Sequence, residues 1–561
     1  MADNGKFWYE HLEHYVSKLR TRFSIPFAFV ATHNHFVFDR GGKVFNRSAP
    51  IIKLRSDSTE ADHLALVALL NTSVACFWMQ QTFHNKGGPG GGSSKDEKWH
   101  DFYEFSATAL QRFPVSQGKP LELGRKLDAL AQQYAAVSTE AIMQGGIPAS
   151  KALDEAKQQA AAVRRQMVAT QEELDWHSYE LYGLLSDDLS YDCEDLPLLS
   201  PGERAFEIVM ARQLMDGILS TRWFEWLHVT PITEIPTHWP TAYQELVARR
   251  IQIIESSKEI ALIEKPDCKR RWETESWDAQ QQRALQDWLL DRLESHSYWP
   301  TPEQEVPRLQ SVAELSDKAS SDHDFLQVAA IYRERDDFNL PLLVAELVAS
   351  ESVPCLPILR YKTAGLRKRE VWEKTWELQR EEDAGQEVGK IKVPPKYATA
   401  DFQKSDYWRL RGKLDVPKER WISCPHCETA SDPSLVVGWA GWNHLQQGTA
   451  IVAYYDARKN EGWSADQLKP LLAGLDQLLP WIHQWHPEID PEYNETAGTS
   501  FQTLLESEAQ ELGLTMEQIR NWTPPAKKKA TKKKAEGGSK PRKARSTRKK
   551  AETEVEEDND E

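Results

Sequence analysis

The sequence predicts an α-rich α/β protein with several packed units, in which a small α/β unit comes first and helical and mixed α+β units follow. A chain of 561 residues is too long for one hydrophobic core. Hydrophobic residues make up 40% of it and include 21 tryptophans, so several cores can form. Helical apolar spacing recurs along most of the chain, whereas short strand-like segments gather near its start. We expect five segments, with bounds at 1–118, 119–190, 191–300, 301–523 and 524–561.

The first segment combines short strands with helices. Strands are predicted at 26–31, 35–38, 43–45 and 51–54, where apolar and aromatic residues are bounded by turns such as Asp39-Arg-Gly-Gly. Helices are predicted at 8–23, 58–70 and 74–81. Ser58 supplies a hydroxyl N-cap for the second helix, and Asn71-Thr-Ser separates that helix from the third. The glycine-rich residues 85–95 predict a mobile loop.

The later segments are mainly helical. Apolar periodicity predicts helices at 121–136, 151–184, 205–215, 243–257, 277–293, 465–485 and 500–512, and on both sides of a break at Phe338-Asn-Leu-Pro within 325–348. The first two form a hairpin that we expect to act as a spacer or packing arm. Residues 350–460 are rich in tryptophan and loops, so we expect mixed structure there. From Pro524 onward the composition predicts disorder.

Cysteine content and hydropathy favour a cytoplasmic protein. Six cysteines in 561 residues are too few for a disulfide framework, and they suit a reducing compartment. The sequence contains no apolar run long enough to span a membrane. Its first residues lack the basic start and apolar stretch of a secretory signal. We therefore expect free thiols, a cytoplasmic, nucleoid-associated location and no membrane partner.

The charge of the chain is distributed unevenly. The net charge is −16, yet residues 526–550 contain thirteen Lys/Arg against one Glu, and the last eleven residues contain seven Asp/Glu. The residues before this tail are therefore more acidic than the net charge suggests. The basic part of the tail predicts salt-dependent attraction to nucleic acid without sequence preference, or else simply a solubilising tail. An acidic body can contact DNA only through a local basic patch or through this tail.

One local basic patch lies between Lys18 and Arg55, where eight Lys/Arg accompany a single acidic residue, Asp39. A β-ribbon with exposed Arg and Asn side chains can enter a groove of DNA and contact phosphates and base edges. The alternative is a solvated basic edge strand. The candidate DNA contacts in this stretch are Arg40, Lys43, Asn46, Arg47 and Lys53.

A second candidate is the glycine-rich loop that begins at Asn85. Lysines beside glycines would let the backbone come close to a phosphate chain. The alternative is an ordinary surface loop. The candidate contacts here are Asn85, Lys86 and Lys95.

The motifs that would carry catalysis or metal binding are weak. Amino-methylating DNA enzymes need an Asn/Asp-Pro-Pro-aromatic loop, and the nearest match, Val393-Pro-Pro-Lys-Tyr397, has Val at the accepting position and Lys at the ring position. Cys424-Pro-His-Cys427 could be half of a zinc site, a redox pair or a pair of loop thiols. A zinc ion would need two more ligands, which Cys355, His444 or His483 would have to supply. We assign no catalytic residue and no metal site.

Several blocks of the chain resemble the large adenine-specific DNA methyltransferases of phage-growth-limitation (BREX type 2) defence. Some of them are also similar to the specificity region of fused restriction–methylation enzymes. The resemblance runs from about residue 20 to 523, and its blocks keep the order of that family. The blocks are Thr32–Phe45, Ser48–Leu54, Ala68–Trp78, Tyr103–Pro114, Glu173–Leu184, Asp406–Trp421, Gly438–Gln447 and Leu479–Tyr493.

This resemblance implies target recognition for adenine-N6 methylation, in which duplex DNA is the partner. The catalytic half of the family, with its S-adenosylmethionine loop, is expected before residue 1, so this chain is expected to bind no cofactor itself. A split enzyme with a separate catalytic chain, a truncated relic and a non-enzymatic scaffold of the defence complex are the alternatives. Further defence proteins are expected partners. Weaker candidate DNA contacts in the matching C-terminal blocks are Arg409, Arg411 and Lys413.

Overall fold

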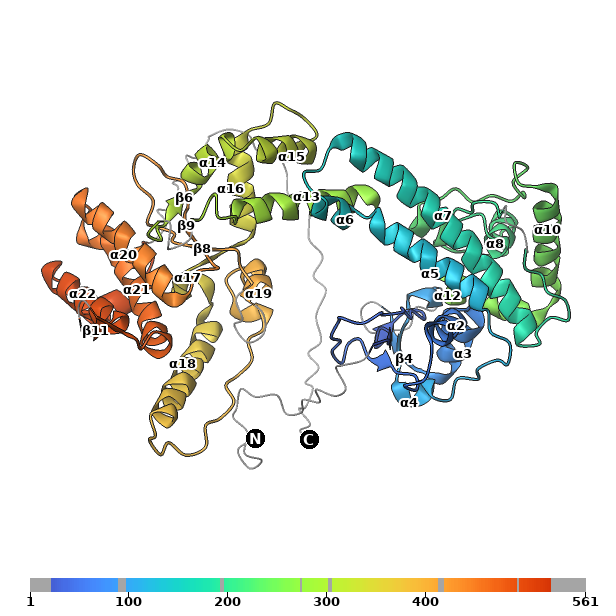
Figure 1. The fold of residues 1–561 in the computed structure, drawn as a ribbon, viewed down its shortest axis with the longest axis horizontal. Coiled ribbons are helices and arrows are strands. Elements are labelled where there is room, and N and C mark those ends of the chain that lie inside the picture. Colours follow the sequence, from blue (N-terminus) through green and yellow to red (C-terminus); the bar gives the residue numbers. More distant parts are fainter. Residues whose placement is uncertain are drawn as a thin grey trace, which may run out of the picture.

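The computed structural model describes residues 22–88, 97–191, 196–272, 275–300, 305–411, 418–491 and 494–525. Of the residues that the structure describes, helices account for 55% and strands for 7%, which confirms the predicted α-rich α/β class. The elements form an arch of two lobes (Figure 1). The first lobe holds β1 to β5 and α2 to α12, and the second lobe holds β6 to β11 and α14 to α23. Helix α13 (Trp277–Leu293) joins the lobes, because it packs on α6 in one direction and on α15 in the other.

The first lobe begins with small antiparallel sheets covered by short helices. Strand β5 pairs with both β2 and β4, and β1 pairs with β3. The strands are β1 (Ile25–Pro26), β2 (Val30–Ala31), β3 (Ile51–Ile52), β4 (His84–Gly87) and β5 (Phe102–Glu104). The helices are α2 (Glu60–Leu70), α3 (Ser73–Thr82) and α4 (Ala107–Leu110), with a 3₁₀ turn at Lys98–His100. Buried Ile25, Phe27, Met79 and Phe105 are part of one apolar core under these elements.

Two predicted strands of this unit do not form. Within residues 35–38 only Phe36 makes a bridge, with Phe27, and Asp39 just after them bridges Ser24. Val37 and Asp39 donate to the backbone carbonyls of Pro26 and Ser24, and the Asn34 side chain donates to the carbonyls of Leu70 and Thr72, so the pairing is present but does not extend into a strand. Residues 43–45 follow two glycines with positive φ and form no strand. The predicted helix at 8–23 lies almost wholly outside the described residues.

A layer of helices completes the first lobe. Helix α7 is the longest, and its first part packs along α5, as the predicted hairpin requires. Its later part carries Val168, Trp176 and Tyr179 into the core that it shares with α8 and α10. The helices are α5 (Leu121–Ala136), α6 (Thr139–Gln144), α7 (Ser150–Leu181), α8 (Ala205–Met215), α9 (Trp223–Leu227), α10 (Thr241–Ser256), α11 (Lys258–Ile263) and α12 (Pro266–Lys269).

Buried charges connect α7 to its neighbours. The Lys269 ammonium lies 2.6 Å from Glu264 and 2.9 Å from Glu172, and all three side chains are buried. Asp175 accepts a hydrogen bond from the backbone N–H of Ser73, the first residue of α3, at 2.8 Å. Because buried charges are stable only with partners, these contacts fix how the small α/β unit sits on the helical layer.

The second lobe surrounds a four-stranded sheet with the order β6-β9-β8-β7, in which only β7 and β8 run parallel. Its strands are β6 (Gln310–Ser311), β7 (Ser352–Pro354), β8 (Trp421–Ser423) and β9 (Val436–Trp439), and β10 (Ile489–Asp490) pairs with β11 (Glu495–Thr496). Its helices are α14 (Val312–Ser320), α15 (His323–Arg333), α16 (Leu340–Ser350), α17 (Pro357–Arg360), α18 (Thr363–Asp383), α19 (Ser405–Arg411), α20 (His444–Asn460), α21 (Ala465–Trp485), α22 (Ala497–Glu511) and α23 (Met516–Arg520), with a 3₁₀ turn at Thr399–Asp401.

Within the described ranges, one bent pair of helices has the length and composition of a membrane span. Among the described residues, no single helix is long and apolar enough to cross a membrane. Helices α2 and α3 reach the required length and composition only together, with a bend of 67° between them. Both helices bury apolar side chains in the first lobe.

Candidate nucleic-acid interface

The predicted basic stretch includes a loop between β2 and β3 that is exposed around residues 42–48, and Lys53 follows β3. Lys43, Asn46, Arg47 and Lys53 all have exposed side chains. The Asn46 side chain accepts a hydrogen bond from the backbone N–H of Ser48, which fixes a tight turn at the tip. Lys43 makes no ion pair with any residue that the structure describes, and the guanidinium of Arg47 lies 5.9 Å from the Phe29 ring. Lys43 and Arg47 can therefore offer their charges outward.

Arg40, at the start of this loop, is engaged within the protein. Its guanidinium lies 2.6 Å from Asp128 on α5 and 2.7 Å from Glu60 on α2. The hydrogen bond to Asp128, followed by that to Glu60, raises the pKa of Arg40. Arg40 thus anchors the loop to two helices, and a phosphate would have to compete with two carboxylates for it.

Asn85 and Lys86 lie on a strand, which corrects the mobile loop predicted to begin at residue 85. Both residues belong to β4, which pairs with β5 across an irregular register. The Asn85 side chain donates to Asp101 at 3.1 Å, and Lys86 pairs with Glu104 at 2.5 Å. The hydrogen bond from Lys86 lowers the pKa of Glu104. The sequence did not predict β4, because the glycines that follow Lys86 indicated a loop. Lys95 lies outside the described residues.

The weaker candidates of the second lobe lie on and after α19. Arg409 is exposed and pairs with Glu351 at 2.9 Å. Arg411 is largely buried, pairs with buried Glu419 at 2.8 Å and lines a cavity. Lys413 lies outside the described residues. Of these three residues, Arg409 is therefore the one that the structure places at the surface.

Two arginines, Arg270 and Arg271, lie beside the loop between β2 and β3, and the sequence did not predict them as part of the site. Arg270 lies 4.6 Å from the Trp226 ring centre and donates to the carbonyl of Trp99. Arg271 pairs with Asp175 at 3.2 Å. Burial, followed by the charge of Arg271, lowers the pKa of His33 to about 3, so this imidazole is neutral near pH 7. The run Lys269-Arg-Arg271 is the sequence signal that could have found these arginines.

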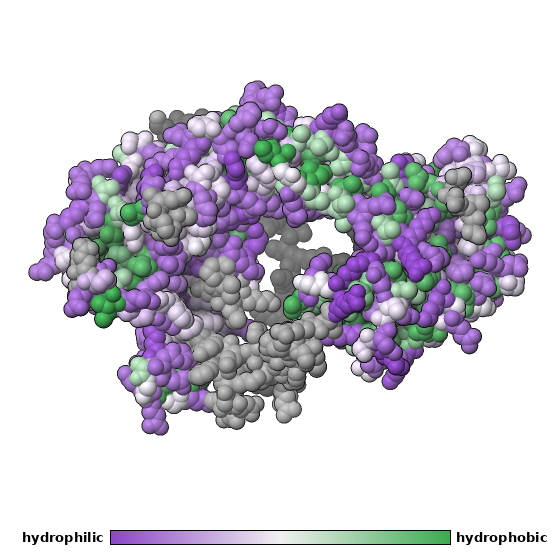
Figure 2. Space-filling model, in the orientation of Figure 1, coloured by the Kyte–Doolittle hydropathy of each residue, from purple (hydrophilic) through white to green (hydrophobic). Residues whose placement is uncertain are grey.

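Elements that carry predicted residues border one opening in the view of Figures 1 and 2. Figure 1 places β4 at the inner edge of the first lobe and α19 at the inner edge of the second. The space-filling view also leaves an opening between the lobes (Figure 2). The elements that carry Lys86 and Arg409 therefore lie on opposite sides of the same concavity.

The cysteines behave as core residues. Cys424 and Cys427 are 3% and 1% exposed and belong to the apolar core of the second lobe. A hydrogen bond with Cys355, followed by burial, raises the pKa of the Cys424 thiol, and burial raises that of Cys427. Their place in the apolar core favours the loop-thiol interpretation, and within the described part of the chain neither cysteine joins a group with the spacing of metal ligands.

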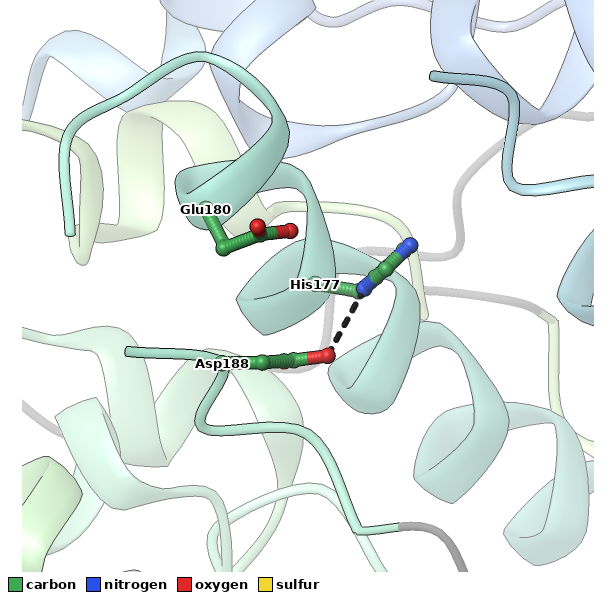
Figure 3. Close-up of side chains that lie close together, drawn as sticks. All are labelled: His177, Glu180 and Asp188. Carbon is green, nitrogen blue, oxygen red and sulfur yellow. Dashed lines mark hydrogen bonds and ion pairs between the residues drawn. The ribbon is translucent and has the colours of Figure 1, made fainter. Parts of the chain in front are cut away.

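The described residues contain one group with the spacing of metal ligands, and the sequence analysis did not select it. His177 and Glu180 lie at the end of α7, and Asp188 lies on the following loop (Figure 3). Nδ1 of His177 is 3.0 Å from the Asp188 carboxylate, as the dashed line in Figure 3 marks. All three residues are partly exposed or exposed, so the arrangement is that of a surface ion pair with a neighbouring acid.

The Pro394-Pro395 segment does not fit a methyltransferase catalytic loop. The Trp372 indole donates to the carbonyl of Pro395, and Lys368 donates to that of Lys396. Tyr397 is buried and stacks on Tyr361 with ring centres 5.2 Å apart. The segment is thus a packed turn without an open acceptor for an amine, and no step of S-adenosylmethionine chemistry is assigned to it.

The comparisons with known proteins define the family. The description "Domain of unknown function (DUF7008)" matches residues 167–534, and the chain belongs to this family. Over 518 residues, or 90% of its length, it is 46% identical to the adenine-specific methyltransferase PglX of Streptomyces coelicolor. The matched region is 42% of that relative, so the chain spans less than half of it. This similarity confirms the resemblance to the phage-growth-limitation methyltransferases. No solved structure matched the chain.

Proposed function

We propose that this chain holds duplex DNA for an adenine-specific (N6) methyltransferase of a bacterial phage-defence system, and that a separate catalytic chain transfers the methyl group. The observation that carries the proposal is the 46% identity to an adenine-specific methyltransferase over nearly the whole chain. Adenine in a duplex must be flipped out of the stack before it can react, so such an enzyme needs a surface that grips the flanking DNA. The opening between the lobes is the candidate for that surface.

The cations of the first lobe support this role. Lys43 and Arg47 are exposed near the tip of a loop that is fixed by an asparagine turn and by the ion pairs of Arg40. A fixed loop with outward charges suits phosphate contacts, which set the register of a protein on DNA. Asn46, Lys53, Asn85 and Lys86 are the other proposed contacts of the first lobe, and Arg409 belongs to α19 on the opposite side. Lys95 and Lys413 complete the proposed set from the sequence alone.

S-adenosylmethionine would supply the methyl group of the complete reaction. The proposal places its site on the partner chain, since the Pro-Pro turn of this chain is packed against Trp372 and Tyr361. The role of this chain is then to bind and orient DNA in the cytoplasm, together with the catalytic chain and other defence proteins.

The test combines binding with methylation. The purified chain, alone and with a catalytic methyltransferase chain supplied as a separate polypeptide, is assayed for duplex binding and for adenine methylation. The double variant Lys43→Ala/Arg47→Ala removes two outward charges. If both contact phosphates, the slope of log affinity against log salt becomes shallower by about 1.8. The matched control, Arg249→Ala/Lys258→Ala, removes two exposed charges from α10 and α11 and should leave that slope unchanged.

Removal of residues 526–561 separates recognition from scaffolding. A recognition chain keeps its preference among duplex sequences after this deletion and loses only part of its affinity. A scaffold loses all DNA affinity with the tail, and that result would replace our proposal with the scaffold alternative. A folded complex that methylates no adenine would refute the proposal altogether.

A further inference from the structure

The second lobe contains a cavity of about 340 Å³ that the proposed DNA interface does not use. It lies between the four-stranded sheet and helices α18, α20 and α21, and its mouth is marked by Trp485, whose side chain is 54% exposed. A volume near 300 Å³ is at the small end of the range for ligand sites. The cavity can therefore hold a molecule of modest size.

The wall of the cavity is aromatic. Trp439, Trp442 and Trp481 line it, and the ring of His444 stacks on Trp481 with centres 5.7 Å apart and planes 19° apart. Burial lowers the pKa of His444, so this ring is neutral near pH 7. Flat faces of this kind favour a planar, aromatic ligand.

Guanidinium groups also line the wall. They belong to Arg360, Arg369 and Arg411, and Arg411 is paired with Glu419 of the same wall. Arg369 is held by Glu373 at 3.0 Å and by Gln477 at 2.9 Å, so its planar guanidinium is fixed in place. A fixed guanidinium suits phosphate, because it can donate two parallel hydrogen bonds.

One buried donor at the cavity has no partner. Trp442 is 5% exposed, and its indole N–H makes no hydrogen bond with any residue that the structure describes. Buried donors without partners are rare in folded proteins, and a ligand acceptor would satisfy this one. Trp442 lines the cavity, so a bound acceptor is one partner available to this donor.

We infer that this cavity binds a free nucleoside phosphate, with its base among the tryptophans and its phosphate near the arginines. The site is distinct from the proposed DNA interface and needs no methyl transfer. The arginines of the wall disfavour the sulfonium of S-adenosylmethionine, so that molecule is expected to bind more weakly than the nucleotides.

The test is calorimetric titration of the full-length protein with adenosine and cytidine 5′-phosphates, adenosine, inorganic phosphate and S-adenosylmethionine. At least one nucleotide should bind, and it should bind more tightly than adenosine or phosphate. Arg369→Met and Trp481→Leu should each weaken binding about 10-fold. Arg308→Met, an exposed arginine of the same lobe outside the cavity, should not. Circular dichroism confirms that each variant is folded, and Arg369→Met tests the site even where Trp481→Leu unfolds it.

Four results overturn the inference. They are the absence of nucleotide binding at millimolar concentration, inorganic phosphate binding as tightly as any nucleotide, S-adenosylmethionine binding more tightly than the nucleotides, and unchanged affinity in folded Arg369→Met. Tighter binding of a single-stranded oligonucleotide, weakened by the same two variants, would make the cavity a strand site and refute the free nucleotide.

Discussion

Replacement of Arg250 by methionine is expected to destabilise the first lobe strongly. Arg250 lies on α10, is 1% exposed and donates to both carboxylate oxygens of Glu173, at 3.0 and 2.5 Å. It also donates twice to the carbonyl of Leu189. Methionine fills a similar volume but leaves the buried Glu173 carboxylate with only the backbone N–H of Tyr191 and a long contact to Tyr243.

The expected cost follows from the charge left behind. Removal of one partner of a buried ion pair costs about 3–5 kcal/mol. For a unit of 150–250 residues, each kcal/mol lowers the midpoint by about 2–4 °C, so the first-lobe transition should fall by about 6–20 °C. Replacement of both partners, Arg250→Met with Glu173→Leu, should recover much of this loss, since no charge then stays buried.

Differential scanning calorimetry of the full-length protein measures the effect. The control is Arg249→Met, which makes the same substitution one residue earlier on the exposed face of α10 and should change stability by less than about 0.5 kcal/mol. If the free energy of unfolding of Arg250→Met lies within about 1 kcal/mol of that of this control, the buried Glu173 charge does not carry the expected cost. A double variant less stable than Arg250→Met would show that packing, rather than the stranded charge, dominates.

Three smaller perturbations test other parts of the structure. Burial raises the pKa of Glu264 to about 7, above its ordinary value of 4.5, so the stability that its protonated form contributes is lost as pH rises between these values. Glu264→Gln should therefore make the melting temperature fall less steeply between pH 5 and 8, and an unchanged pH dependence would contradict the raised pKa of Glu264. The pKa of His33 is lowered to about 3, so the stability that its neutral form contributes is present above pH 6.5 and is lost as pH falls. His33→Gln should reduce the drop in melting temperature between pH 6.5 and 4, and an equal drop in both proteins would argue that His33 is not buried. Thr59→Ala removes the side chain that caps α2 and should lower the free energy of unfolding in urea by about 1 kcal/mol, whereas Ser58→Ala should change it little. A larger loss in Ser58→Ala than in Thr59→Ala would place the cap at Ser58.

Local sequence determined most of the helices. Helices α5, α8, α13 and α21 begin and end at the predicted residues, because apolar periodicity and nearby caps such as Ser276 suffice to set them. The resemblance to adenine-specific methyltransferases was also readable from short blocks, and the identity over 90% of the chain confirms it.

Tertiary structure decided the strands and the state of the candidate site residues. Residues 35–38 keep only an isolated bridge, next to an Asn34 side chain bound to the end of α2, whereas Asn85 gains a ladder because β5 lies beside it. The sequence identified Arg40 and Arg411 as candidate DNA contacts, but it did not show their carboxylate partners. The fold brings Asp128, which is distant in the chain, to Arg40, and it brings Glu419 back to Arg411. Whether an arginine is free to contact DNA depends on which carboxylates the fold brings close to it, and the local pattern of charges in the sequence carries no information on those partners.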